Sequence, residues 1–317
     1  MGTATRVPQR RDVRGEELSG DEAWAALRRY GGWSLARDSF VRFRYADGFS
    51  HSRALALQTV LSLVPLAIAA IGLSGALHTE GIGRVAELTI RRITSGPSQE
   101  MVDEALRLSR RHAGDGGQAA LWLGLLFSLV NVTTALCQVE RGANRIYGNE
   151  RDRPFPLKYS WGLAMAVLAG LPLGLSFLLT VLGSDLTHAA TQTYHLGPGT
   201  TRAWEILRWP VGVLLAVLAT SAIFRLSPRR DQPGYTWLAF GAVLYLVLWN
   251  GATWGLSLYV GVSGSFTSVY GPLSAVMALL LWSYLTSLAL FLGLAFAAQL
   301  EAVRAGVTRP ARPDPGV

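Results

Sequence analysis

The part of the chain that decides the fold runs from Gln232 to Leu300, and its two most apolar pieces read YTWLAFGAVLYLVLWNGATWGLSLYV (235–260) and PLSAVMALLLWSYLTSLALFLGLAFAAQL (272–300). No Asp, Glu, Lys, Arg or His occurs anywhere in these 69 residues. A bilayer core is crossed by about 20 apolar helical residues, so the stretch is too long for one span and fits two. Glycines and hydroxyl residues fill the break at 261–271, and Pro272 is a favoured first residue of a new helix. The sequence therefore predicts a protein that crosses a membrane several times.

Four further apolar stretches extend this prediction to an all-α membrane protein with six transmembrane helices in a domain covering 54–301. The fourth stretch is the shortest, and its flanking arginines, Arg208 and Arg225, are long enough to reach the membrane surface from a short span. The six predicted spans are 54–78, 116–139, 159–184, 207–226, 235–260 and 271–300. A small helical outer loop is expected between the first two spans, with short helices at about 84–94 and 98–112.

The distribution of positive charge predicts the orientation. The formal net charge is +8, and 21 of the 29 lysines and arginines lie in the N-terminal region, the 140–158 and 225–231 loops and the C-terminal tail. The loops between these segments hold the remaining eight. Because short cytoplasmic loops carry the excess of Lys and Arg, both termini are expected in the cytoplasm. The basic excess is then mainly a topology signal, and no nucleic-acid partner is expected.

The two ends of the chain are polar. Residues 1–20 and 302–317 are predicted to be a disordered basic N-terminus and a disordered cytoplasmic tail. Residues 21–53 are predicted to form amphipathic helices in the headgroup plane, broken at Gly31-Gly32, because aromatic residues alternate there with arginines. The aromatic and aliphatic members are Trp24, Leu27, Trp33, Phe40 and Phe43, and the arginines are Arg28, Arg29, Arg37, Arg42 and Arg44. Nucleic-acid binding is the competing interpretation of such a pattern.

The middles of the predicted spans contain neutral polar residues and no ionisable ones, which disfavours a proton-driven antiporter. The candidates are Gln58, Ser62, Asn131, Thr134 and Asn250. An amide in hydrocarbon needs a partner, so one interpretation is that these residues only join helices. The other is that they line a cavity for an uncharged or amphipathic substrate.

Prolines and glycines inside the spans predict local geometry. Pro65 and Pro172 are expected to kink their helices. The pairs Gly170/Gly174 and Gly251/Gly255 are expected to let helix backbones approach closely.

No pattern in the chain predicts catalysis. The outer-loop residues His188, His195 and Asp185 have no compact metal-ligand spacing, and no phosphate-binding glycine loop or catalytic triad occurs. We therefore predict no catalytic residue, no metal and no cofactor. The single cysteine, Cys137, lies in an apolar stretch and is expected to be an inert buried residue.

Four segments resemble the YihY/BrkB family. They are RALALQTVLSLVPL (53–66), ALCQVERGANRIYG (135–148), PFPLKY (154–159) and SLY (257–259) followed by YGPLSAVMALLLWSY (270–284). The resemblance covers about 37–301. Gln58 stands where the family usually has Tyr, and Ala295 where many members have Glu.

The resemblance adds residues to the candidate set. From its motifs, Tyr259, Tyr270, Trp282 and Tyr284 join the possible cavity lining, and Asn144, Arg145, Tyr147 and Lys158 form a cytoplasmic loop motif. It implies a six-span inner-membrane protein of bacteria linked to envelope integrity. Members of the family have been called virulence factors or ribonuclease BN, or connected with lipid-like envelope precursors.

Three hypotheses follow for function. The leading one is a non-enzymatic protein that binds or translocates a lipid-like substrate, with membrane lipids as partners. The second is a structural or scaffold membrane protein. The third is a membrane-attached ribonuclease acting in tRNA processing, which the scarcity of clustered carboxylates disfavours. The sequence makes no prediction of oligomeric state.

Overall fold

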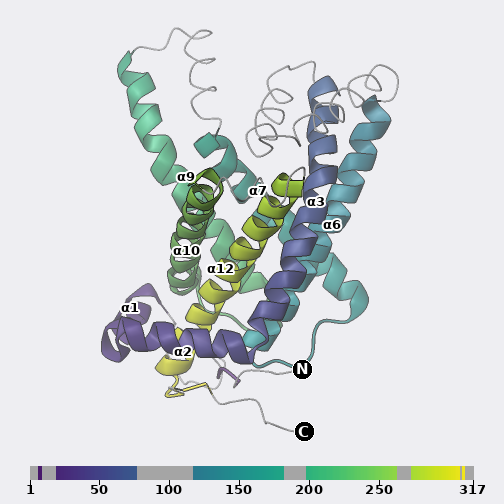
Figure 1. The fold of residues 1–317 in the computed structure, drawn as a ribbon. Helices are drawn as coiled ribbons and strands as arrows, with labels where there is room; N and C mark the ends of the chain where they lie inside the picture. Colours follow the sequence, from purple (N-terminus) through teal and green to yellow (C-terminus); the bar gives the residue numbers. More distant parts are fainter. Residues whose placement is uncertain are drawn as a thin grey trace. The chain divides into compact units, whose positions relative to one another are not determined.

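The computed structural model describes residues 6–8, 19–76, 117–181, 198–262, 273–307 and 309–310. The regular structure of these residues consists of eight helices, without a strand, so the all-α prediction is confirmed for this part of the chain (Figure 1). The helices are α1 (Gly20–Tyr30), α2 (Gly32–Tyr45), α3 (Gly48–Ala76), α6 (Gly117–Ile146), α7 (Phe155–Val181), α9 (Pro198–Leu226), α10 (Tyr235–Val262) and α12 (Ser274–Arg304).

Five helices of the described residues are long and apolar enough to cross a membrane. The apolar parts are Trp122–Ile146 of α6, Phe155–Ser176 of α7, Gly199–Leu226 of α9, Tyr235–Val260 of α10 and Val276–Arg304 of α12. Each corresponds to one of the second to sixth predicted spans. The first predicted span falls on α3, a helix of 29 residues.

The helices are longer than the apolar stretches at several ends. Helix α6 continues beyond 139 to Ile146, α7 begins at Phe155 rather than 159, and α9 begins at Pro198 rather than 207. Helix α3 begins at Gly48, inside the segment 21–53 that was predicted to lie at the interface. The physical reason is that hydropathy locates only the part of a helix that suits hydrocarbon, while backbone hydrogen bonding continues into polar turns.

The predicted break at Gly31-Gly32 is present. Gly31 has φ of +88°, in the region that favours glycine, and it separates α1 from α2. Pro65 and Pro172 lie inside α3 and α7, each of which continues through its proline. A third internal proline, Pro210, lies within α9, which begins at Pro198.

Some predicted features lie outside the described residues. The outer loop with its helices at 84–94 and 98–112 is one, and the outer-loop residues Asp185, His188 and His195 are another. Tyr270 also falls there.

The chain divides into two compact units. Unit 1 comprises Met1–Asp47, Glu140–Leu246 and Leu292–Val317. Unit 2 comprises Gly48–Val139 and Val247–Phe291. In unit 1 the Ser176 hydroxyl of α7 donates to the Gly212 carbonyl of α9 at 2.8 Å, which joins these two helices.

A close helix contact in unit 1 lies at glycines other than the predicted pairs. A Cβ placed on Gly241 of α10 would lie 2.5 Å from the Gly293 carbonyl oxygen of α12, and one on Gly293 would lie 2.6 Å from the Gly241 carbonyl. By contrast, a Cβ on Gly251 or Gly255 would meet nothing within 4 Å, and the same holds for Gly170 and Gly174. The prediction of close approach at those two pairs is therefore wrong, because small residues permit contact without requiring it.

Candidate functional site

The described residues that were predicted to line a cavity all belong to unit 2. Gln58 and Ser62 lie on α3, Asn131 and Thr134 on α6, Asn250 and Tyr259 on α10, and Trp282 and Tyr284 on α12. Their side chains differ in burial and in partners, so they are described in turn.

One pair of amides joins α3 to α6. The Gln58 side-chain nitrogen donates to the Asn131 side-chain oxygen at 3.2 Å and lies 3.4 Å from the Asn131 backbone carbonyl. The Asn131 side-chain nitrogen in turn donates to the Phe127 carbonyl of its own helix at 2.8 Å. Both amides are half-buried. The pair connects two helices. Because neither amide is fully buried, a third molecule can still reach its polar atoms.

A second interhelical contact joins α12 to α10. The Trp282 indole nitrogen donates to the Thr253 hydroxyl at 3.2 Å. On either side of Thr253 in α10, Asn250 and Tyr259 are exposed, and on α12 Tyr284 is half-buried. Tryptophan thus acts here both as an apolar surface and as a hydrogen-bond donor.

The two hydroxyl candidates bond within their own helices. Ser62 donates to the carbonyl of the residue four positions earlier at 2.7 Å, and Thr134 does the same at 2.8 Å. Such bonds satisfy a hydroxyl in an apolar helix without an interhelical partner.

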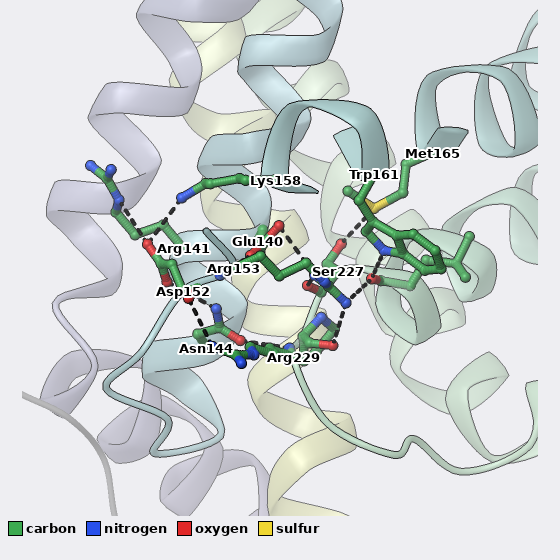
Figure 2. A network of polar contacts seen from close by, with 12 residues as sticks. Glu140, Arg141, Asn144, Asp152, Arg153, Lys158, Trp161, Met165, Ser227 and Arg229 are labelled. Carbon is green, nitrogen blue, oxygen red and sulfur yellow. Dashed lines mark hydrogen bonds and ion pairs between the residues drawn. The ribbon is translucent and has the colours of Figure 1, made fainter. Parts of the chain in front are cut away.

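The predicted loop motif lies in unit 1 and belongs to a network of charged and amide groups, which we call the Asp152 network (Figure 2). Its members come from α6, from the segment before α7, from the start of α7 and from the segment after α9. They are Glu140, Arg141, Asn144, Asp152, Arg153, Lys158, Ser227 and Arg229.

Asn144 ties three segments of this network together. Its side-chain nitrogen donates to an Asp152 carboxylate oxygen at 2.9 Å, and its side-chain oxygen accepts the Arg229 backbone N–H at 2.8 Å. The side chain is completely buried. A residue with one donor and one acceptor group is required here, so the amide is chemically specific at this position.

The Asp152 carboxylate is surrounded by donors. Lys158 Nζ lies 2.9 Å away and Arg141 Nε 3.4 Å away. Desolvation opposes the charged form, but the hydrogen bonds from Asn144 and Lys158 and the nearby positive charges outweigh it, so the pKa of Asp152 lies below its ordinary value. Asp152 therefore carries its negative charge at neutral pH.

Arg153 connects a buried carboxylate to the end of α9. Its guanidinium lies 3.1 Å from Glu140, whose side chain is completely buried. The same guanidinium donates to the Ser227 carbonyl at 2.9 Å and lies 3.3 Å from the Pro228 carbonyl oxygen. It therefore satisfies carbonyls that the C-terminus of a helix leaves unpaired.

A second buried network in unit 1 centres on Arg230, and we call it the Arg230 network. Arg230 pairs with Glu301 near the end of α12, and only 1% and 3% of the two side chains are exposed. The Arg230 guanidinium also donates to the Val7 carbonyl at 3.2 Å and lies 4.6 Å from the centroid of the Tyr147 ring. Buried charges require such partners, because removing one partner leaves the other charge unpaired.

Arg42 extends the Arg230 network to α2. It donates to the Gln299 side-chain oxygen at 2.8 Å and to the Ile146 carbonyl at 3.2 Å. Burial lowers the pKa of Arg42 to about 10, so it remains charged at neutral pH. Burial also raises the pKa of the Tyr147 hydroxyl, which stays neutral.

Within the predicted disordered N-terminus, 1–20, the structure describes residues 6–8 and also 19–20, where Ser19 precedes α1 and Gly20 begins it. The Val7 N–H donates to the Tyr147 carbonyl at 3.2 Å, and the Val7 side chain is buried. The structure therefore gives Val7 defined partners in unit 1.

Sequence reasoning named Asn144, Arg145, Tyr147 and Lys158 but gave them no role. It missed the buried charges of Arg42, Glu140, Arg153, Arg230 and Glu301. One signal was available: Glu140 and Glu301 are each the first carboxylate after a long apolar stretch. Although position 295 is Ala, α12 still holds a buried carboxylate at Glu301.

No group of three or more His, Cys, Asp or Glu residues that could hold a metal ion is found within the described ranges.

Comparison with known proteins identifies the family. The model of the virulence factor BrkB family matches residues 39–316, so this chain belongs to that family of membrane proteins. The chain is similar to a UPF0761 membrane protein of Stenotrophomonas maltophilia strain K279a, with 26% identity over 84% of this chain and 62% of that protein. A UPF0761 membrane protein of Kangiella koreensis is 24% identical over 80% of this chain and 60% of its own length. No solved structure matches the chain.

A shorter relative carries a different name. The putative ribonuclease-like protein YfkH of Bacillus subtilis is 22% identical over 82% of this chain and 92% of its own length. The chain thus spans nearly all of YfkH but less than two thirds of the UPF0761 relatives.

Proposed function

We propose that this protein is a six-span protein of the bacterial cytoplasmic membrane that binds or translocates an amphipathic, lipid-like substrate and so supports envelope integrity. The observation that carries the proposal is the half-buried Gln58–Asn131 amide pair on the apolar helices α3 and α6 of unit 2. Two side-chain amides offer donors and acceptors without net charge. They suit the uncharged or zwitterionic headgroup of a molecule whose tail stays in an apolar environment.

The proposal includes an orientation. We propose that both termini lie in the cytoplasm and that residues 21–53 lie at the membrane surface. The cytoplasmic placement is supported by the charge distribution, since 21 of the 29 lysines and arginines lie on the segments assigned to that side. The Asp152 and Arg230 networks then belong to the cytoplasmic side, where they fix the ends of α6, α9 and α12.

A scaffold without transport activity is the second candidate function. The direct hydrogen bond between Gln58 and Asn131 favours it, because an amide pair that already satisfies itself has no need of a substrate. The two functions make opposite predictions for removal of the pair.

The test is lipid crossing in liposomes. The purified protein is reconstituted with headgroup-labelled phospholipid, and the rate at which label moves between leaflets is measured. Gln58→Leu with Asn131→Leu removes both amides. The double variant should lose less stability than either single variant, because no amide is left without its partner. Thr59→Val is the matched control, because the Thr59 hydroxyl bonds only the Leu55 carbonyl of the same helix at 2.9 Å.

We expect crossing by the wild type and by Thr59→Val and none by the double variant, with similar thermal stability in all three. Crossing by the double variant at the wild-type rate would remove these residues from the site. No crossing by any folded form would favour the scaffold. Cleavage of added tRNA by the pure protein would instead support the function suggested by the name of the Bacillus relative.

A further inference from the structure

Helix α2 has the reverse of the usual surface pattern. Its buried face holds Asp38, Ser39 and Arg42, together with Leu35 and Phe43. On its exposed face Trp33 is 84% and Phe40 47% exposed. In a water-soluble helix the polar face is turned outward and the aromatic residues inward.

The exposed residues form one continuous stripe. Trp33, Arg37, Phe40 and Arg44 follow one another at intervals of four, three and four residues, which places them on the same side of a helix. All four are exposed, and 62% of the Arg37 side chain is accessible although its Nε lies 3.2 Å from Asp38. Aromatic and basic groups therefore alternate along this stripe, which we call the α2 stripe.

Contacts on the buried face hold the α2 stripe outward. Arg42 is anchored to Gln299 of α12 at 2.8 Å. The Tyr30 hydroxyl donates to Asp38 at 2.7 Å, a bond that raises the pKa of Tyr30. Rotating α2 about its axis to bury Trp33 would break both contacts and leave the charges of Arg42 and Asp38 exposed or without these partners. The contacts of unit 1 therefore keep the α2 stripe facing outward.

We infer that the α2 stripe is a binding surface for the phosphate groups of anionic lipids in a bilayer. Arginine guanidinium groups match phosphate oxygens with paired hydrogen bonds, and Trp and Phe are favoured at the depth of the headgroups. The inference deepens the proposed membrane-surface position of residues 21–53 by naming the face and its ligand.

The neighbouring helix supports the same surface. Trp24 of α1 is half-exposed, and the guanidinium of the exposed Arg28 lies 5.4 Å from the centroid of its ring. Three of the aromatic side chains predicted to lie in the headgroup plane, Trp24, Trp33 and Phe40, are thus exposed. Phe43 is not, because it packs into unit 1.

The test measures the depth of α2 in the full-length protein. Cys137 is replaced by Ala, and Ala36→Cys, an exposed position on the side of the α2 stripe, carries an environment-sensitive fluorophore. The protein is reconstituted in phosphatidylcholine vesicles with increasing phosphatidylglycerol, and quenching by brominated lipid is recorded. We expect quenching to rise with phosphatidylglycerol and to weaken in high salt.

Two variants separate charge from folding. Arg37→Gln with Arg44→Gln should lower the ratio of docked to undocked α2 about 25-fold, since each arginine contributes about fivefold near an anionic surface. Arg37→Lys with Arg44→Lys keeps the charge and should retain most of the phosphatidylglycerol dependence. Lipid crossing, measured in the same vesicles, tests the proposed function separately, because the label reports only the position of α2.

The inference would be overturned if quenching did not depend on the phosphatidylglycerol content, or if it were unchanged in the Gln variant. A second result would also overturn it. If the detergent-solubilised protein binds tRNA, the Gln variant loses that binding, and phosphatidylglycerol has no effect on quenching, the α2 stripe recognises nucleic acid instead of lipid.

Discussion

The two units of this protein use different chemistry to hold their helices. In unit 1, buried charges do so: Glu140 pairs with Arg153, and Arg230 with Glu301. In unit 2, the interhelical contacts that we describe are neutral, as in the Gln58–Asn131 pair and the Trp282–Thr253 bond. A buried ion pair is costly to open, whereas a neutral hydrogen bond inside a membrane contributes about 0.6 kcal/mol.

This difference bears on function. A protein that passes an amphipathic molecule must exchange its own contacts for contacts with that molecule, which weak neutral bonds allow. The charged networks of unit 1 are suited to fixing helix ends instead. The predictions that follow test whether the two kinds of contact differ in strength as their chemistry implies.

The largest effect is expected from breaking the Arg230 network. Glu301→Gln leaves the Arg230 guanidinium buried without a counter-charge, and we expect a loss of about 3–5 kcal/mol in stability. Thermal unfolding in detergent, calibrated by denaturant titration, measures it. Glu205→Gln on the exposed face of α9 is the matched control and should change stability by less than about 0.5 kcal/mol. Equal stability of the two variants would mean that unit 1 is not held by its buried charges.

The second effect concerns the glycine contact between α10 and α12. Gly293→Ala places a methyl group 2.6 Å from the Gly241 carbonyl oxygen and 2.9 Å from the Tyr245 Cβ, so the helices must separate. We expect a loss of about 1–3 kcal/mol, measured by the same unfolding assay. Gly251→Ala on α10 meets open space and should be neutral or stabilising by up to about 1 kcal/mol. A tolerated Gly293→Ala would show that this crossing is looser than described.

These glycines illustrate what the sequence can predict. The helical class and the second to sixth apolar helices follow from hydropathy, because the length of an apolar run is a local property. Which glycines lie at a helix contact depends instead on how two helices pack against each other, and hydropathy does not report this. The sequence pointed to Gly251 and Gly255, yet the close contact lies between Gly241 of α10 and Gly293 of α12.

The candidate site shows the same division. Gln58 and Asn131 were both named from the sequence because amides inside apolar stretches are conspicuous, and the structure joins them. Arg42 and Glu301 were missed because arginines and carboxylates at helix ends are normally solvated. Their burial depends on Gln299, Tyr147 and Arg230, which come from distant parts of the chain.

A smaller effect is expected in the Asp152 network, where the carboxylate is partly exposed. The pKa of Asp152 is lowered in the folded protein, so its contribution is present above the unfolded value of 3.8 and is lost as the pH falls through the folded value. At pH 7 Asp152→Asn should lose up to about 1 kcal/mol, and the difference from wild type should shrink below about pH 4. Unfolding temperatures from pH 7 to pH 3.5 measure this.

The control for that pH series is Glu150→Gln, two residues away and exposed, which should stay within about 0.5 kcal/mol of wild type at pH 7. A difference between Asp152→Asn and wild type that grows as the pH falls would contradict the assigned contacts with Lys158 and Arg141.

The smallest effect is the most informative about unit 2. A double-mutant cycle of Gln58→Leu and Asn131→Leu should give a coupling of about 0.6 kcal/mol, measured by unfolding in detergent. The half-buried amides can each find water or lipid headgroups when the partner is lost, so the single variants should be only slightly less stable than the double. A coupling as large as that expected for Arg230 and Glu301 would make the pair a rigid joint and favour the scaffold. A weak coupling together with lost lipid crossing would mean that the amides serve the substrate more than the fold.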